Sequence, residues 1–136
     1  MPKKGAYVLY LEVPNPLTLP VGALKACFLP AGRYAYVGSA KSGIEGRISR
    51  HRRLAATKTG KRRWHIDYLL VHPEVRLVEA KTFAGDSECR ISRGLASRKG
   101  VTAPVPRFGS TDCRAGCKAH LYIIRRSRRA DRGFTA

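Results

Sequence analysis

One stretch, residues 34–51, constrains the fold more than any other part of the chain. With its leading Arg33 it reads RYAYVGSAKSGIEGRISRH, which predicts a short aromatic strand, a Gly-Ser turn and a strongly basic helix. On a helical wheel, Ile44, Ile48 and His51 share one face, whereas most of the arginines point elsewhere. The helix can therefore pack on a sheet while it displays cations, which is the layout of a phosphate-handling site.

Runs of β-branched and aromatic residues, bounded by Gly and Pro, predict the strands of this sheet. The expected strands cover residues 6–13, 21–29, 33–37, 75–83 and 120–125. We expect the first three to form an N-terminal antiparallel unit, with a Pro-rich loop after the first strand and a turn over residues 38–43.

Helical patterns follow the aromatic strand and recur later in the chain. The expected helices cover residues 44–55, 64–71 and 88–97, the first capped by Ser42. The Gly, Pro and Ser content of residues 99–116 predicts irregular structure. The sequence thus predicts a single small α/β (α+β) domain over residues 1–126, with a mostly antiparallel central sheet flanked by helices, and a basic tail over residues 127–136.

The charge of the chain points to its partner. There are 27 Lys and Arg residues against 9 Asp and Glu, which gives a net charge of +18. Such an excess destabilises a compact state by self-repulsion, so we expect it to serve a polyanionic partner, with nucleic acid first. The residues expected to contact that partner are Arg50, Arg52, Arg53, Lys61, Arg62 and Arg63.

The sequence also bears on where the protein resides. No run approaches the roughly 18 consecutive apolar residues of a membrane-spanning helix. The N-terminal apolar run is short and broken by Glu12 and Pro14, so it does not resemble an export signal. We therefore expect a cytoplasmic protein without a membrane partner, in which the four cysteines stay reduced.

Several short motifs carry a family resemblance. The triplets GAY at residues 5–7 and YVG at residues 36–38 resemble the two halves of the GIY-YIG nuclease signature, and Arg47 and His51 stand where that family carries Arg and His. Glu88 opens a later helix, as does the metal-binding Glu of the family. The ordered set YAYVGSA, RISRH, WHIDYLL, ECRI and FGSTDC resembles the DUF123 branch of GIY-YIG-like proteins over nearly the whole chain.

The resemblance implies an endonuclease that hydrolyses phosphodiester bonds in DNA with Mg²⁺ or Mn²⁺. It implies catalytic roles for Tyr7, Tyr36, Arg47 and His51 and a metal-binding role for Glu88, all converging on one face of the sheet.

These residue types suit the reaction, which needs an activated water, a cation for the charge on the phosphoryl oxygens and usually a divalent metal. Arg47 offers a planar, permanently charged fork for a phosphate, and Glu88 offers a hard oxygen ligand. A tyrosine, with a usual pKa of about 10, needs nearby positive charge to act as the base. His51 would orient a group or relay a proton.

Two departures from the family pattern support a rival function. Ser39 stands where many relatives carry Lys, and the late Asn of the family has only Ser110 or Asp112 as its nearest counterpart. The rival is a non-catalytic nucleic-acid-binding module on the same scaffold.

A third reading is a small zinc protein. Cys113, Cys117 and His120 have metal-ligand spacing, with His65 as a distant fourth ligand, but they form only half of an ordinary zinc site. We therefore expect reduced cysteines in an irregular loop. Asp67, which lies amid apolar neighbours, is expected to be a buried hydrogen-bonding organiser rather than a ligand.

Overall fold

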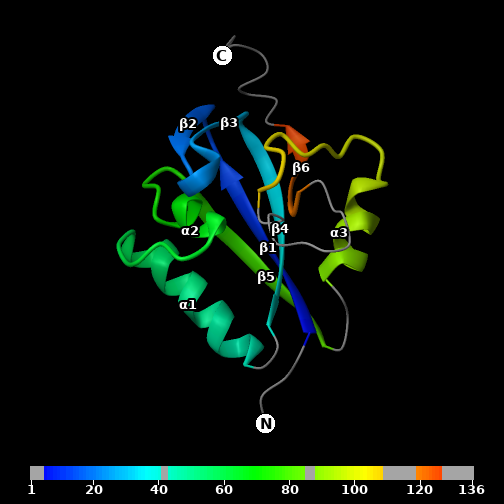
Figure 1. The fold of residues 1–136 in the computed structure, drawn as a ribbon, viewed down its shortest axis with the longest axis horizontal. Helices are drawn as coiled ribbons and strands as arrows, with labels where there is room; N and C mark the ends of the chain where they lie inside the picture. The colour runs from blue at the N-terminus through cyan, green and yellow to red at the C-terminus, as the bar shows by residue number, and fades with distance from the viewer. Residues whose placement is uncertain (1–4, 41–42, 85–87, 109–118, 127–136) are drawn as a thin grey trace.

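A four-stranded antiparallel sheet forms the centre of the protein (Figure 1). The computed structural model describes residues 5–40, 43–84, 88–108 and 119–126. The strands, in sheet order, are β5 (Arg76–Ala84), β1 (Gly5–Val13), β4 (Gly32–Ala40) and β6 (Leu121–Arg126). The expected fold class, a small mixed α/β domain with an antiparallel sheet, is confirmed.

The pairing of β1 with β4 determines which side chains share a face. The register runs from Gly5 opposite Ala40 to Val13 opposite Gly32, and it places Tyr7 opposite Gly38 and Leu9 opposite Tyr36. Because side chains alternate along a strand, Tyr7 and Tyr36 lie on the same face of the sheet.

Helices cover both faces of the sheet (Figure 1). On the face of Tyr7 and Tyr36 lie α1 (Ile44–Thr57) and α2 (His65–Leu70), which together with β1 and β4 enclose the larger hydrophobic core. The opposite face is covered by α3 (Glu88–Ala96), whose Ile91 and Leu95 pack against Val8, Val37 and Tyr122.

The helix predicted from the basic stretch is confirmed, and it extends two residues further, to Thr57. Its apolar face is the predicted one, since Ile44, Ile48 and His51 are all buried. The predicted Ser42 cap lies outside the described residues, and Gly43 occupies the cap position in a left-handed conformation. The predicted turn over residues 38–43 is wrong in its first half, because β4 continues to Ala40.

The expected strand over residues 21–29 is wrong in its N-terminal half. A short 3-10 turn, η1 (Gly22–Leu24), replaces it, because the Val21 N–H bonds back to the Lys25 carbonyl and Lys25 takes a φ of +60°. The remainder, β3 (Ala26–Leu29), pairs with β2 (Leu17–Pro20), which lies in the expected loop. These two strands form a separate sheet, so only the first and third of the expected strands, β1 and β4, pair with each other as antiparallel neighbours.

The later elements lie close to their predicted places. The elements expected at residues 64–71, 75–83, 88–97 and 120–125 correspond to α2, β5, α3 and β6. The basic tail, residues 127–136, lies outside the described part of the chain. No helix in the part that the structure describes is long and apolar enough to cross a membrane.

Candidate functional site

A hydrogen-bonded tyrosine–histidine pair lies between the sheet and α1. The Tyr7 hydroxyl is 2.8 Å from Nε2 of His51, and the two residues are 2% and 0% exposed. Gly38, opposite Tyr7, makes room for the phenol ring, because a Cβ at this position would lie 2.5 Å from the Tyr7 hydroxyl oxygen. The glycine on β4 and the tyrosine on β1 are therefore one packing unit.

His51 is neutral near pH 7. Burial is the main cause that lowers its pKa from 6.5 to about 4; the carboxylate of Asp67 opposes this shift, and the charges of Arg50 and Arg47 add to it. Its Nδ1 atom has no hydrogen-bond partner among the described residues. A neutral imidazole with so low a pKa is a poor acceptor for the proton of a phenol. We assign His51 to orienting the Tyr7 hydroxyl.

Three arginines surround Trp64, the only tryptophan of the chain. The guanidinium carbons of Arg47, Arg50 and Arg63 lie 4.4, 4.8 and 5.1 Å from the centroid of its ring. We call these four residues the Trp64 cluster. The His51 ring meets Trp64 nearly edge-on, with 6.3 Å between centroids, so the cluster adjoins the Tyr7–His51 pair.

Arg47 is held from two sides. Its Nη1 donates a hydrogen bond of 3.0 Å to the Ser39 carbonyl near the end of β4, while its guanidinium contacts Trp64. A cation over an indole face is a favourable contact. The partly exposed guanidinium is thus held beside the buried Tyr7–His51 pair.

Asp67 organises the other side of the cluster. It is fully buried, and both of its oxygens accept hydrogen bonds of 3.0 Å from Arg50. Its Oδ2 also accepts hydrogen bonds of 2.7 and 2.9 Å from the backbone N–H groups of Arg63 and Trp64, at the start of α2. The prediction that Asp67 is a buried hydrogen-bonding organiser is confirmed. The Arg50 guanidinium is bonded to Asp67 and to the Lys61 carbonyl. Its predicted contact with nucleic acid stays a prediction.

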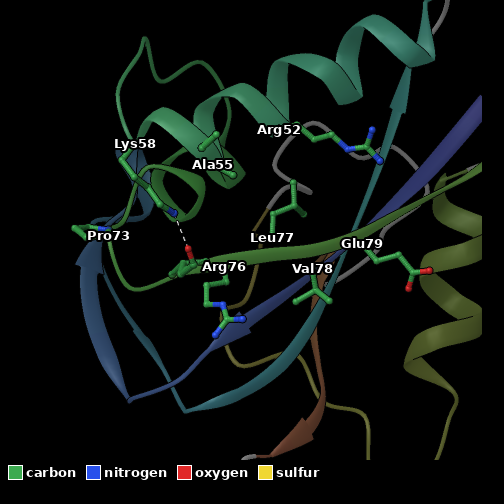
Figure 2. Close-up of a pocket in the computed structure, with 10 residues that line it drawn as sticks. Arg52, Ala55, Lys58, Pro73, Arg76, Leu77, Val78 and Glu79 are labelled. Atoms are coloured by element: carbon green, nitrogen blue, oxygen red, sulfur yellow. Dashed lines mark hydrogen bonds between the residues drawn. The ribbon is translucent and has the colours of Figure 1, made fainter.

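Arg52 lies apart from the Trp64 cluster. It points about 160° away from Arg50 round the helix, and it lines a groove of about 420 Å³ between α1 and the edge strand β5 (Figure 2). In this groove Lys58 donates hydrogen bonds to the carbonyls of Leu70 and Val75, at 3.0 and 2.6 Å, and burial lowers its pKa. Lys58 therefore fastens the end of α1 to the segment that leads into β5.

The two remaining predicted site residues, Tyr36 and Glu88, lie on different elements, β4 and α3. Tyr36 shares the face of Tyr7 and meets Phe108 edge-on. Glu88 begins α3, which packs on the opposite face of the sheet through Ile91 and Leu95. This placement of α3 differs from the expected convergence on one face. The Glu88 side chain lies outside the described residues, so its role as a metal ligand stays a prediction.

The metal predictions stay untested. Within residues 5–40, 43–84, 88–108 and 119–126, no three His, Cys, Asp or Glu side chains form a group that could hold a metal ion. Cys113 and Cys117 of the alternative zinc site lie outside these ranges. His120 is buried just before β6, and His65 packs edge-on against Phe108.

The sequence did not single out Trp64, which was predicted only to begin the helix over residues 64–71. The available signal was its position directly after the basic run of residues 61–63. The remaining predicted contacts, Arg53, Lys61 and Arg62, are exposed on α1 and on the loop that follows it.

Comparison with known proteins gives one match. No curated protein and no solved structure is similar to this chain. A family model described as a domain of unknown function, DUF123, matches residues 6–135, which is nearly the whole sequence. The chain therefore belongs to the DUF123 family.

Proposed function

We propose that this protein is a metal-dependent endonuclease that hydrolyses phosphodiester bonds in DNA. The observation that carries the proposal is the Tyr7–His51 hydrogen bond beside the fixed guanidinium of Arg47. The net charge of +18 and the resemblance of the triplets at residues 5–7 and 36–38 to the GIY-YIG signature support it.

Arg47 would stabilise the charge that develops on the phosphoryl oxygens as water attacks phosphorus. One of its five N–H groups is engaged by the Ser39 carbonyl, which leaves others for a phosphate. Because Ser39 and Trp64 already hold the guanidinium, little reorganisation is needed when the charge appears.

As a phenolate, after the release of its own proton to solvent, Tyr7 would take the proton of the attacking water. In the tautomer with a proton on Nε2, neutral His51 donates to the Tyr7 oxygen and stabilises the phenolate, and the charge of Arg47 acts in the same direction. Tyr36, on the same face, is the second tyrosine of the proposed site. Glu88 is the proposed ligand of Mg²⁺ or Mn²⁺, since a carboxylate is the donor these ions prefer. When bound, such an ion supplies Lewis-acid stabilisation of phosphoryl charge.

The burial of the pair favours the rival function, non-catalytic binding of nucleic acid. Tyr7 and His51 are 2% and 0% exposed, so the hydroxyl that would activate water does not face solvent. This rival accounts for the basic surface without turnover. It predicts tight binding that weakens steeply with salt and does not respond to Glu88→Ala.

Cleavage assays separate the two functions. Plasmid and branched DNA are incubated with Mg²⁺ or Mn²⁺ and with wild type, Arg47→Ala, Glu88→Ala or Arg93→Ala, the last being a matched control, since Arg93 is an exposed arginine of α3 outside the predicted contacts. The proposal predicts cleavage by wild type and Arg93→Ala, and a loss of roughly 10²- to 10³-fold in Arg47→Ala, the cost of removing one fixed transition-state donor. A wild type that binds but cuts no substrate, or an Arg47→Ala and a Glu88→Ala that both cut as fast as wild type, would refute the enzyme.

A further inference from the structure

Two aromatic rings at the start of α2 lie partly exposed, and an exposed arginine covers each of them. Arg63 lies 5.1 Å from the Trp64 ring centroid, and Arg62 lies 5.7 Å from that of Tyr68. Trp64 directly precedes α2 and Tyr68 lies four residues further along the chain, so the helical rise separates their Cα atoms by roughly 6 Å along the axis. This spacing is wider than the roughly 3.4 Å between stacked bases of a duplex strand.

The loop that supplies these arginines is fixed to α1. Gly60 adopts a φ of +140° where a Cβ would lie 2.5 Å from Cδ2 of Leu54, so the backbone passes closely over the helix. The Lys61 carbonyl accepts a hydrogen bond of 2.9 Å from Arg50. The basic side chains after Gly60 are therefore displayed from an anchored backbone.

The two arginines are held only loosely on their rings. Neither Arg62 nor Arg63 forms an ion pair with a carboxylate in the described part of the chain. A cation on an exposed aromatic face is weakly held, and a nucleobase stacks on such a face more strongly. A base can therefore replace Arg62 on Tyr68 and Arg63 on Trp64, and each freed guanidinium can then move to a neighbouring phosphate, while Arg47 and Arg50 stay held by Ser39 and Asp67.

We infer that Trp64 and Tyr68 form a binding track for single-stranded nucleic acid, in which two successive unstacked bases lie on the two rings. Lys61, Arg62 and Arg63 contact the phosphates of the same strand. Exposed aromatic rings between cations are the usual means of binding single strands without sequence preference. Arg47, which contacts Trp64, connects the track to the Tyr7–His51 pair. As a description of the substrate, namely DNA with an unpaired segment at the site, the inference rests on the proposed function.

Fluorescence of the single tryptophan tests the track directly. Wild-type protein in EDTA, where metal-dependent cleavage does not occur, is titrated at fixed salt with oligo(dT), oligo(U) and a duplex of equal length. We expect both single strands to quench the emission of Trp64 and to bind more tightly than the duplex, and the two oligonucleotides to show whether DNA or RNA is preferred. Equal affinity for duplex and single strands, or binding of single strands without a change in emission, would overturn the inference.

Variants test the second ring. Tyr68→Leu keeps an apolar side chain against the core but removes the aromatic face, and anisotropy of labelled oligo(dT) should show a roughly 5- to 150-fold loss of affinity, the value of one stacked base. Duplex affinity should stay near that of wild type. Phe28→Ala is the matched control, because Phe28 is an aromatic residue of β3, 57% exposed and outside the track. Thermal melting confirms that each variant is folded.

These outcomes are distinct from those of the cleavage assay. Tyr68→Leu binding that equals wild type overturns the track whether or not the protein cleaves DNA. A wild type that prefers single strands but never cleaves keeps the track and refutes the endonuclease.

Discussion

The substitution Asp67→Asn tests whether the buried carboxylate organises the site. Asp67 is fully buried and receives two hydrogen bonds from Arg50 and two from the backbone at the start of α2. The asparagine amide keeps one oxygen acceptor, but the substitution removes the negative charge. It also places an N–H₂ group opposite a hydrogen-bond donor that the carboxylate had accepted from. Breaking a buried ion pair by changing one partner costs about 3–5 kcal/mol. Since the Arg50 side chain keeps 18% exposure and can be partly resolvated, we expect the lower end, about 3 kcal/mol.

Thermal and urea unfolding measure this loss. In a chain of this size about 3 kcal/mol lowers the melting temperature by roughly 10 °C. The matched control is Glu12→Gln, because Glu12 and Arg33 form an ion pair of the same 3.0 Å length with side chains 38% and 37% exposed. An exposed pair contributes about 0.5 kcal/mol or less. An Asp67→Asn variant no less stable than Glu12→Gln would refute the organising role.

Two further predictions concern the Tyr7–His51 unit. Because the folded protein holds the pKa of His51 at about 4 while the unfolded chain titrates near 6.5, the unfolding free energy should fall as pH is lowered from 6.5 to 4, by up to about 3 kcal/mol. Urea titrations should show this loss reduced in His51→Gln and retained in His72→Gln, a partly exposed control, and equal pH slopes in wild type and His51→Gln would contradict it. Gly38→Ala should destabilise by about 1–3 kcal/mol because its Cβ overlaps the Tyr7 ring, whereas Gly46→Ala, an open position of α1, should not destabilise. A Gly38→Ala variant with the same melting temperature as wild type would contradict this, because it would show that the overlap is relieved without loss of stability.

Local patterns were sufficient to predict the elements that carry most of the fold. The buried face of α1 follows from the spacing of Ile44, Ile48 and His51, because the 3.6-residue period places them together. The burial of Asp67 follows from its apolar neighbours in a short helix. These features depend on residues close in sequence, which is why the sequence alone predicts them.

Features made by distant residues were not predictable in this way. The sequence marks a turn at Gly38, but only the pairing with β1 shows that the glycine accommodates Tyr7 within a continuing strand. Trp64 contacts Arg47 because α2 folds back along α1. The hydrophobic periodicity of a helix does not predict a contact between two separate elements. The placement of α3 on the opposite face depends on the packing of Ile91 and Leu95. The helical pattern of the sequence shows that these two residues are buried, but it does not show which face of the sheet they cover.

The rate at which Tyr7→Phe nicks supercoiled plasmid DNA in Mg²⁺ or Mn²⁺ tests the proposed activity most directly. This substitution removes only the hydroxyl bonded to His51 and keeps the ring that fills the space over Gly38. Tyr10→Phe is the control, because Tyr10 lies on the same strand but packs on the opposite face. We predict that wild type and Tyr10→Phe nick at the same rate and that Tyr7→Phe is slower by about 100-fold or more. Nicking by Tyr7→Phe at the wild-type rate, or no nicking by the wild type, would contradict the proposed function.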